Sequence, residues 1–148
     1  MIVLISTLFC IIAGATMSLQ GVINTRLSDK AGLYEANIFV QGTAFLFSLL
    51  ALLFLGSGQL SALFSVKRVY LLGGLLGLII TITVMLGFKS LSPTIAVALI
   101  LIAQLIVAAL IDHFGWFGTD KTPFHWTKLL GVALMIIGII IFKTNIKK

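Results

Sequence analysis

The sequence predicts an all-α integral membrane protein with five transmembrane helices. Of its 148 residues, 60% are hydrophobic and only 9% are charged, whereas about a quarter of the residues of a soluble domain carry charge. Crossing a bilayer takes about 20 mostly apolar residues. Five stretches qualify: residues 2–24, 36–56, 68–88, 93–111 and 127–143. Because these stretches occupy most of the chain, we expect a single transmembrane domain over residues 1–148, with short loops.

The charged residues lie beside the apolar stretches, and the net charge is +6. Cations at the membrane interface explain this excess. A nucleic-acid partner is not expected, because no basic patch with interleaved aromatic residues is present. The N-terminal side of the membrane would hold Lys67, Arg68, Lys121 and Lys128, and the opposite side would hold Arg26, Lys30, Lys89, Lys143, Lys147 and Lys148. This distribution weakly favours a cytoplasmic C-terminus and permits insertion in both orientations.

The residues offer no sign of catalysis or of metal binding. The single cysteine, Cys10, lies inside the first stretch and is interpreted as a small apolar core residue. Neither paired cysteines nor clustered histidines suggest a metal site. The Gly73-Gly74-x-x-Gly77 pattern is not a phosphate loop, because no strand precedes it. We therefore expect no enzyme activity, no metal and no cofactor.

Side-chain amides lie on one face of the first stretch and at the start of the second stretch. Gln20 and Asn24 are four residues apart, so they share a helix face. Asn37 and Gln41 have the same spacing at the start of the second stretch. Both pairs lie near the same connecting loop and hence at a similar depth in the membrane. Ser18 lies off this face, and we expect it to bond back to its own backbone.

A third polar face lies on the fourth stretch and continues to the residue that follows it. Gln104, Ala108 and Asp112 recur at every fourth residue. Asp112 is a candidate for proton coupling, because intramembrane carboxylates commonly are. The alternative is a helix-terminal carboxylate held by His113, Lys121 or a loop amide. His113 is the second coupling candidate. Because it leaves the helix at a different angle from Asp112, a histidine in the core or at an interface is the favoured interpretation.

The amides are expected to bond to each other, to water or to a ligand. An unsatisfied amide in hydrocarbon costs roughly 2–7 kcal/mol. Bonds between helices, each contributing about 0.6 kcal/mol, explain any single amide. A polar cavity better explains the whole set, which is spread over three stretches. The candidate substrate-binding residues are Gln20, Asn24, Asn37, Gln41 and Gln104.

Glycines and turn residues predict how the helices begin, end and pack. Gly73 and Gly77 have the spacing that lets helices approach closely. Gly131 and Gly138 share a face of the last stretch, which has no polar residue in its middle and can pack against a copy of itself.

The first connection is expected over residues 26–37, with Ser28 or Asp29 as a helix cap and Gly32 in a turn. Ser92-Pro93 predicts a helix start. An interfacial aromatic belt is expected from Trp116, Phe117 and Trp126.

Four segments resemble a known family: SLQGVINTRL, QGTAFLFSLL, AQLIVAALIDHFGWFG and KLLGVALMIIGIIIF. They are similar to the five-helix YdcZ-type family of the drug/metabolite transporter superfamily, which is related to EamA-like and small multidrug-resistance transporters. The resemblance covers nearly the whole chain. Its most specific elements are Gln20-x-x-x-Asn24-x-x-Leu27 and Gln104-x7-Asp112-His113-Phe114-Gly115.

The resemblance implies a transporter and names no substrate. Larger relatives have ten helices in two inverted five-helix repeats, so this chain corresponds to one half. Its partner would be a second copy in an antiparallel homodimer, or a homologous five-helix subunit. Small multidrug-resistance pumps carry a glutamate in their first helix, where this chain offers only Gln20 and Asn24. Their proton-antiport mechanism therefore does not carry over.

Together these observations favour a small inner-membrane transporter that acts as a dimer. It would move a small polar or amphipathic solute by alternating access around a site near the middle of the membrane. The alternatives are a non-transporting membrane subunit, a lipid-flippase component and a passive channel. The small number of ionisable residues near the path argues against a selective ion channel.

Overall fold

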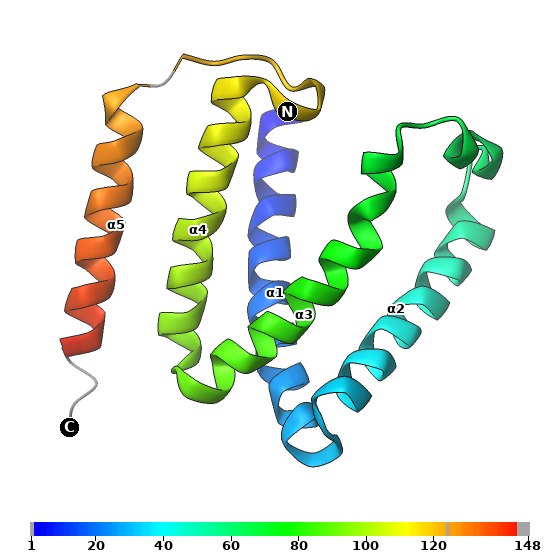
Figure 1. The fold of residues 1–148 in the computed structure, drawn as a ribbon, viewed down its shortest axis with the longest axis horizontal. Helices are drawn as coiled ribbons and strands as arrows, with labels where there is room; N and C mark the ends of the chain where they lie inside the picture. The colour runs from blue at the N-terminus through cyan, green and yellow to red at the C-terminus, as the bar shows by residue number, and fades with distance from the viewer. Residues whose placement is uncertain (1, 124, 145–148) are drawn as a thin grey trace. The chain divides into compact units, whose positions relative to one another are not determined.

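The computed structural model describes residues 2–123 and 125–144, and within these ranges it contains helices and no strand (Figure 1). The helices are α1 (Ile2–Ala31), α2 (Leu33–Leu55), η1 (Leu60–Phe64), η2 (Arg68–Leu72), α3 (Gly73–Ser90), α4 (Pro93–Phe114), η3 (Trp116–Gly118) and α5 (Trp126–Thr144). The three η elements are short 3₁₀ helices. Each of the five predicted stretches overlaps one α-helix.

The predicted fold class is confirmed: this is an all-α integral membrane protein. Among the described residues, four helical segments are long and apolar enough to cross a membrane: Ile2–Ala31, Leu33–Leu55, Arg68–Ser90 and Pro93–Phe114. The last helix is apolar over a shorter segment, Trp126–Phe142. Lys147 and Lys148, which contribute to the predicted charge bias, lie outside the described residues. The chain divides into two compact units, Met1–Ser90 and Leu91–Lys148.

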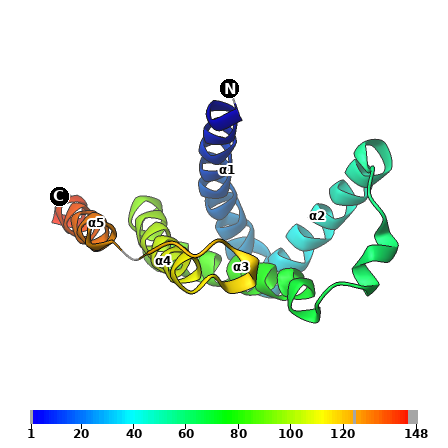
Figure 2. The ribbon, with the colours of Figure 1, turned by 90° about the horizontal axis from the view of Figure 1, so that it is seen from above.

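In the first unit, α1, α2 and α3 pack together near Gly32. From Gly32, α1 and α2 run apart, as two perpendicular views show (Figures 1 and 2). The N-terminal half of α1 and the C-terminal half of α2 are exposed within the unit. Cys10 lies in this exposed half of α1, so the prediction that it is a core residue is wrong. The buried residues lie at the converging end: Gly21, Asn24, Thr25, Ser28, Ala36, Asn37, Met85 and Phe88.

The connection between α1 and α2 is a single residue, Gly32, so the longer loop predicted over residues 26–37 is wrong. Gly32 has φ 103° and ψ 156°, a conformation that essentially only glycine adopts. The predicted turn at Gly32 is confirmed, but neither predicted cap forms. Ser28 lies inside α1 and its hydroxyl donates to the Thr25 carbonyl at 2.8 Å. Asp29 is also helical, and its carboxylate lies 3.6 Å from the Lys89 ammonium.

The second unit contains α4 and α5, which run antiparallel and in contact (Figures 1 and 2). As predicted, α4 starts with Ser92 as the N-cap residue and proline in the first turn. It ends at Gly115, which has the left-handed conformation (φ 66°, ψ 36°). The Gly115 N–H donates to the Ile111 carbonyl at 2.8 Å. In the following loop, the Thr122 N–H donates to the Asp112 carbonyl at 3.0 Å, which ties the loop to the end of α4.

Candidate functional site

Four buried polar residues gather where the helices of the first unit converge, and we call them the polar junction. Asn24, Thr25 and Ser28 lie on α1, and Asn37 lies on α2. Their relative exposures are between 3% and 7%, which is rare for polar residues unless they serve bonding or binding. Sequence periodicity identified Asn24 and Asn37, but it did not single out Thr25 or Ser28.

A glycine allows α3 to close one side of this region. A Cβ atom built at Gly21 would lie 3.0 Å from the ring carbon Cζ of Phe88 and 3.3 Å from each Cε carbon. The Phe88 ring therefore packs directly on the α1 backbone, one turn before Asn24. Phe88 and Met85 are both buried. Apolar atoms of α3 therefore cover α1 next to the polar junction.

Within the described residues, one fully buried acceptor of the polar junction has no hydrogen-bond partner. The Thr25 hydroxyl donates to the Gly21 carbonyl at 2.7 Å, and the Ser28 hydroxyl is bonded as described above. The Asn37 Oδ1 atom is buried and has no hydrogen-bond partner among the described residues. An unsatisfied buried acceptor costs about 1–3 kcal/mol. The polar junction therefore presents an acceptor that a water or a solute donor can satisfy.

One turn after Asn37, Gln41 links α2 to α3. Its Nε2 atom donates to the Thr81 hydroxyl at 3.5 Å, and that hydroxyl donates to the Gly77 carbonyl at 2.8 Å. A Cβ built at Gly77 would lie 3.7 Å from the same Nε2 atom. The Thr81 hydroxyl therefore bonds both to the backbone of its own helix and to the side chain of Gln41. In the sequence, the feature that could have singled out Thr81 is its position one turn after Gly77.

The other two candidate amides are exposed. Gln20 lies one turn before Asn24 on α1, and Gln104 lies on α4 in the second unit. Asn24, Asn37 and Gln41 are thus close together at the converging end of the first unit, and Gln104 belongs to a separate unit. Ser18 donates to the Gly14 carbonyl at 3.1 Å, as expected.

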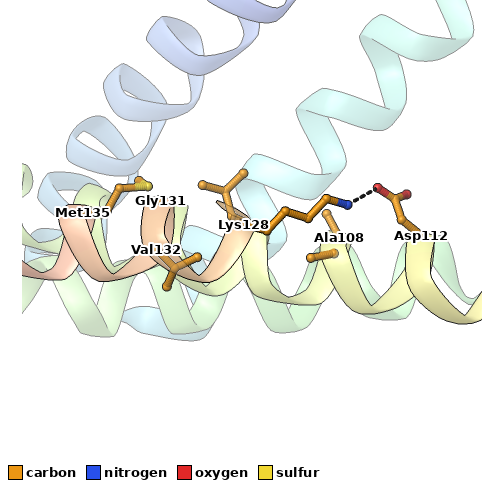
Figure 3. Close-up of a pocket in the computed structure, with 8 residues that line it drawn as sticks. Ala108, Asp112, Lys128, Gly131, Val132 and Met135 are labelled. Carbon is orange, nitrogen blue, oxygen red and sulfur yellow. Dashed lines mark ion pairs between the residues drawn. The ribbon is translucent and has the colours of Figure 1, made fainter. Parts of the chain in front are cut away.

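In the second unit, Asp112 is paired with a cation on the neighbouring helix. Its Oδ2 atom lies 3.8 Å from Nζ of Lys128, at the start of α5 (Figure 3). The sequence analysis offered His113, Lys121 or a loop amide as possible partners of this carboxylate, and it did not identify Lys128. The His113 ring packs edge-on against Phe114, with centroids 4.9 Å apart.

The ion pair stands beside an open groove of about 460 Å³ between α4 and α5. Figure 3 shows labelled side chains of both helices around it. The groove is lined by Leu105, Ala108, Ala109, Asp112, Lys128, Gly131, Val132 and Met135.

Three of the four predicted packing glycines have open surroundings. No described atom outside their immediate backbone lies within 4 Å of a Cβ built at Gly73, Gly131 or Gly138. Gly77 is the exception, because Gln41 approaches it. Across residues 2–123 and 125–144, the structure contains no group of three or more His, Cys, Asp or Glu residues that could hold a metal ion.

The comparisons with known proteins identify the family. Residues 5–141 match the family model described as "Putative inner membrane exporter, YdcZ". Neither the curated proteins nor the solved structures include a match to the chain. An exporter family is a transporter class and not an enzyme class, and its inner-membrane location agrees with the apolar helices. The chain belongs to the YdcZ family, a family of multi-pass inner-membrane transporters related to the drug/metabolite transporters.

Proposed function

We propose that this protein exports a small solute across the inner membrane and binds it at the polar junction. The observation that carries the proposal is the Asn37 Oδ1 atom, a buried acceptor without a partner in the described chain. A solute with a hydrogen-bond donor would satisfy it. The solute class is therefore a small polar or amphipathic molecule that carries at least one N–H or O–H group.

Two features favour solute binding over a purely structural role for these amides. If the amides only joined helices, Asn37 Oδ1 would be expected to accept a bond from α1 or α3, because buried acceptors in folded proteins are nearly always paired. The bond from Gln41 to Thr81 is also long, at 3.5 Å. Both side chains could therefore turn to a ligand while losing little bonding within the protein.

Asn37→Leu tests this proposal. The change removes an unpaired acceptor, so the folded protein should be as stable as the parent or more stable. Binding should be lost. The measurement is the thermal shift of purified protein across a panel of metabolites and organic cations, followed by uptake into proteoliposomes for each hit.

The matched control is Thr43→Val, on the same helix. Within the described part of the chain, its hydroxyl donates only to the Phe39 and Val40 carbonyls of its own helix, so this variant should keep every ligand response. A hit that survives Asn37→Leu would refute binding at the polar junction. No hit with any compound would favour the non-transporting subunit.

We propose further that the transporter is an antiparallel homodimer, with a homologous five-helix subunit as the alternative partner. A second, inverted copy would reproduce the inverted repeats of ten-helix relatives, and alternating access would follow from rocking of one copy against the other. The nearly even distribution of cations agrees with dual insertion.

Spin labels at the exposed residues Tyr34 and Leu55 distinguish the two dimer orientations. These positions lie about 32 Å apart along α2. An antiparallel dimer brings position 34 of one copy closer to position 55 than to position 34 of the other, when measured by pulsed electron resonance. The reverse order, or a monomer, would contradict the proposal.

The ion pair with Lys128 favours the structural interpretation of Asp112, in which the carboxylate is held at the end of α4. Proton coupling through Asp112 predicts a different result. In that case the pH dependence of transport would disappear in Asp112→Asn. We expect it to persist.

A further inference from the structure

We propose that the groove between α4 and α5 binds one phospholipid with a zwitterionic headgroup of the phosphoethanolamine type. Asp112 would receive the ammonium and Lys128 the phosphate. An acyl chain would lie along the apolar wall formed by Leu105, Val132 and Met135. This site lies within the second unit and does not depend on the solute site proposed at the polar junction.

The groove has the size and lining that an acyl chain requires. Its volume of about 460 Å³ lies within the range of ligand pockets, roughly 300–1,000 Å³. Apart from the ion pair, every lining residue is apolar or glycine. The hollow exists because Ala108, Ala109 and Gly131 are small where the two helices face each other. A free polar solute would leave these walls uncovered by apolar atoms.

The two charges have bonding capacity to spare. The distance of 3.8 Å between Asp112 and Lys128 exceeds the roughly 2.7–2.9 Å of a charge-assisted hydrogen bond. Their side chains remain 49% and 37% exposed, respectively. A lysine has three donors and a carboxylate about four acceptor positions. A headgroup with one cation and one anion complements both, whereas an anionic lipid would place uncompensated negative charge near Asp112.

The charges also lie at the depth where a headgroup belongs. Asp112 is in the last turn of α4 and Lys128 in the first turn of α5. Trp116 and Trp126, in the same loop region, are 50% and 82% exposed, and exposed tryptophan is typical of the membrane interface. From the ion pair, the groove continues along both helices toward Leu105 and Met135. Headgroup and acyl chain therefore match its two ends.

Native mass spectrometry of the detergent-solubilised full chain tests the proposal. Delipidated protein is mixed with equal amounts of phosphatidylethanolamine and phosphatidylglycerol, and retained lipid is counted per chain. We expect one tightly held phosphatidylethanolamine. Gly131→Leu places a side chain in the groove where a Cβ meets open space, and it should reduce occupancy by about tenfold, as the loss of roughly 1.4 kcal/mol implies.

Gly138→Leu is the matched control, because Gly138 shares the helix and the open surroundings of Gly131 but does not line the groove. It should retain the lipid. If both variants lose lipid, or if both lose self-association, the face binds a helix of a second copy and the proposal is wrong. Should Gly131→Leu fail to fold, Ala108→Leu fills the same groove from α4.

The headgroup assignment has its own test. Asp112→Asn should abolish the preference for phosphatidylethanolamine over phosphatidylglycerol, because the partner of the ammonium is lost while Lys128 still binds phosphate. Lys128→Gln should weaken both lipids by about tenfold, as expected for the loss of one charge-assisted contact. An unchanged preference in Asp112→Asn, or a parent protein that retains phosphatidylglycerol instead, would overturn the assignment.

Discussion

Replacing Gly32 by alanine should destabilise the first unit, because Gly32 alone connects α1 to α2. Its φ of 103° and ψ of 156° lie in a region that costs other residues about 1–3 kcal/mol. Alanine also restricts the unfolded chain, which offsets about 0.4–1 kcal/mol. The added Cβ would displace the carboxylate of Glu35, an exposed and flexible side chain that can move. We therefore expect a net loss of about 1–2 kcal/mol in the free energy of unfolding.

Gly42→Ala is the matched control on the same helix. Gly42 is inside α2, it is exposed, and a Cβ there meets no described atom within 4 Å. Alanine is favoured over glycine in a helix by up to about 1 kcal/mol, so this variant should be more stable than the parent. The two glycine-to-alanine changes thus have opposite signs, which can be measured by helix loss on titration with a denaturing detergent.

The same pair of variants tests how the polar junction is built. The angle set at Gly32 brings Asn24 of α1 and Asn37 of α2 into one buried region, so Gly32→Ala should also weaken any ligand response. If Gly32→Ala is as stable as the parent, or changes stability in the same direction as Gly42→Ala, the backbone argument is refuted.

Three further experiments test individual contacts and one helix end. Gly21→Leu should cost about 1–3 kcal/mol through overpacking against Phe88, and Phe88→Ala should cost much less in that background than in the parent; additive losses would contradict the contact. Gln41→Leu and Thr81→Val should show a coupling of no more than about 0.6 kcal/mol in a double-mutant cycle, because their bond is long; a larger coupling would mean that the bond is structural. Gly115→Ala should cost about 1–2 kcal/mol at its left-handed position, and Gly115→Asn should cost less; equal thermal stability of both variants and the parent would refute this cap.

The helices were predictable from composition, but the connection between α1 and α2 was not. Apolar length alone located all five helices, and Ser92-Pro93 located the start of α4. Ser28 and Asp29 favour caps in isolation, yet a cap requires a non-helical backbone, and nothing between Ser28 and Ala31 interrupts the helix. The charged residues before Gly32 therefore remain helical, and the chain changes direction only at Gly32, where a glycine permits it.

Periodicity predicted the face of each polar residue but not how far along the helix its neighbours extend. Gln20 and Asn24 share a face, yet Asn24 is buried and Gln20 is exposed, because α2 and α3 cover α1 only near Gly32. The partner of Asp112 was missed for a related reason. His113 and Lys121 are close in sequence, whereas Lys128 reaches Asp112 through the antiparallel packing of α4 and α5, which periodicity does not show.

Exposed amides, rather than exposed apolar faces, should determine which surface meets a second copy. Lipid covers apolar side chains without penalty, so their exposure on the diverging halves of α1 and α2 creates no drive to associate. Lipid tails cannot form hydrogen bonds with the exposed amide of Gln20, however, so this amide needs a hydrogen-bond partner from elsewhere. We therefore expect Gln20→Leu to weaken self-association in bilayers by roughly threefold, the equivalent of one bond of about 0.6 kcal/mol. Leu19→Ala, at a neighbouring apolar position that is 65% exposed, should leave association unchanged. If Leu19→Ala has the larger effect, apolar packing and not amide bonding holds the copies together, and this reasoning fails.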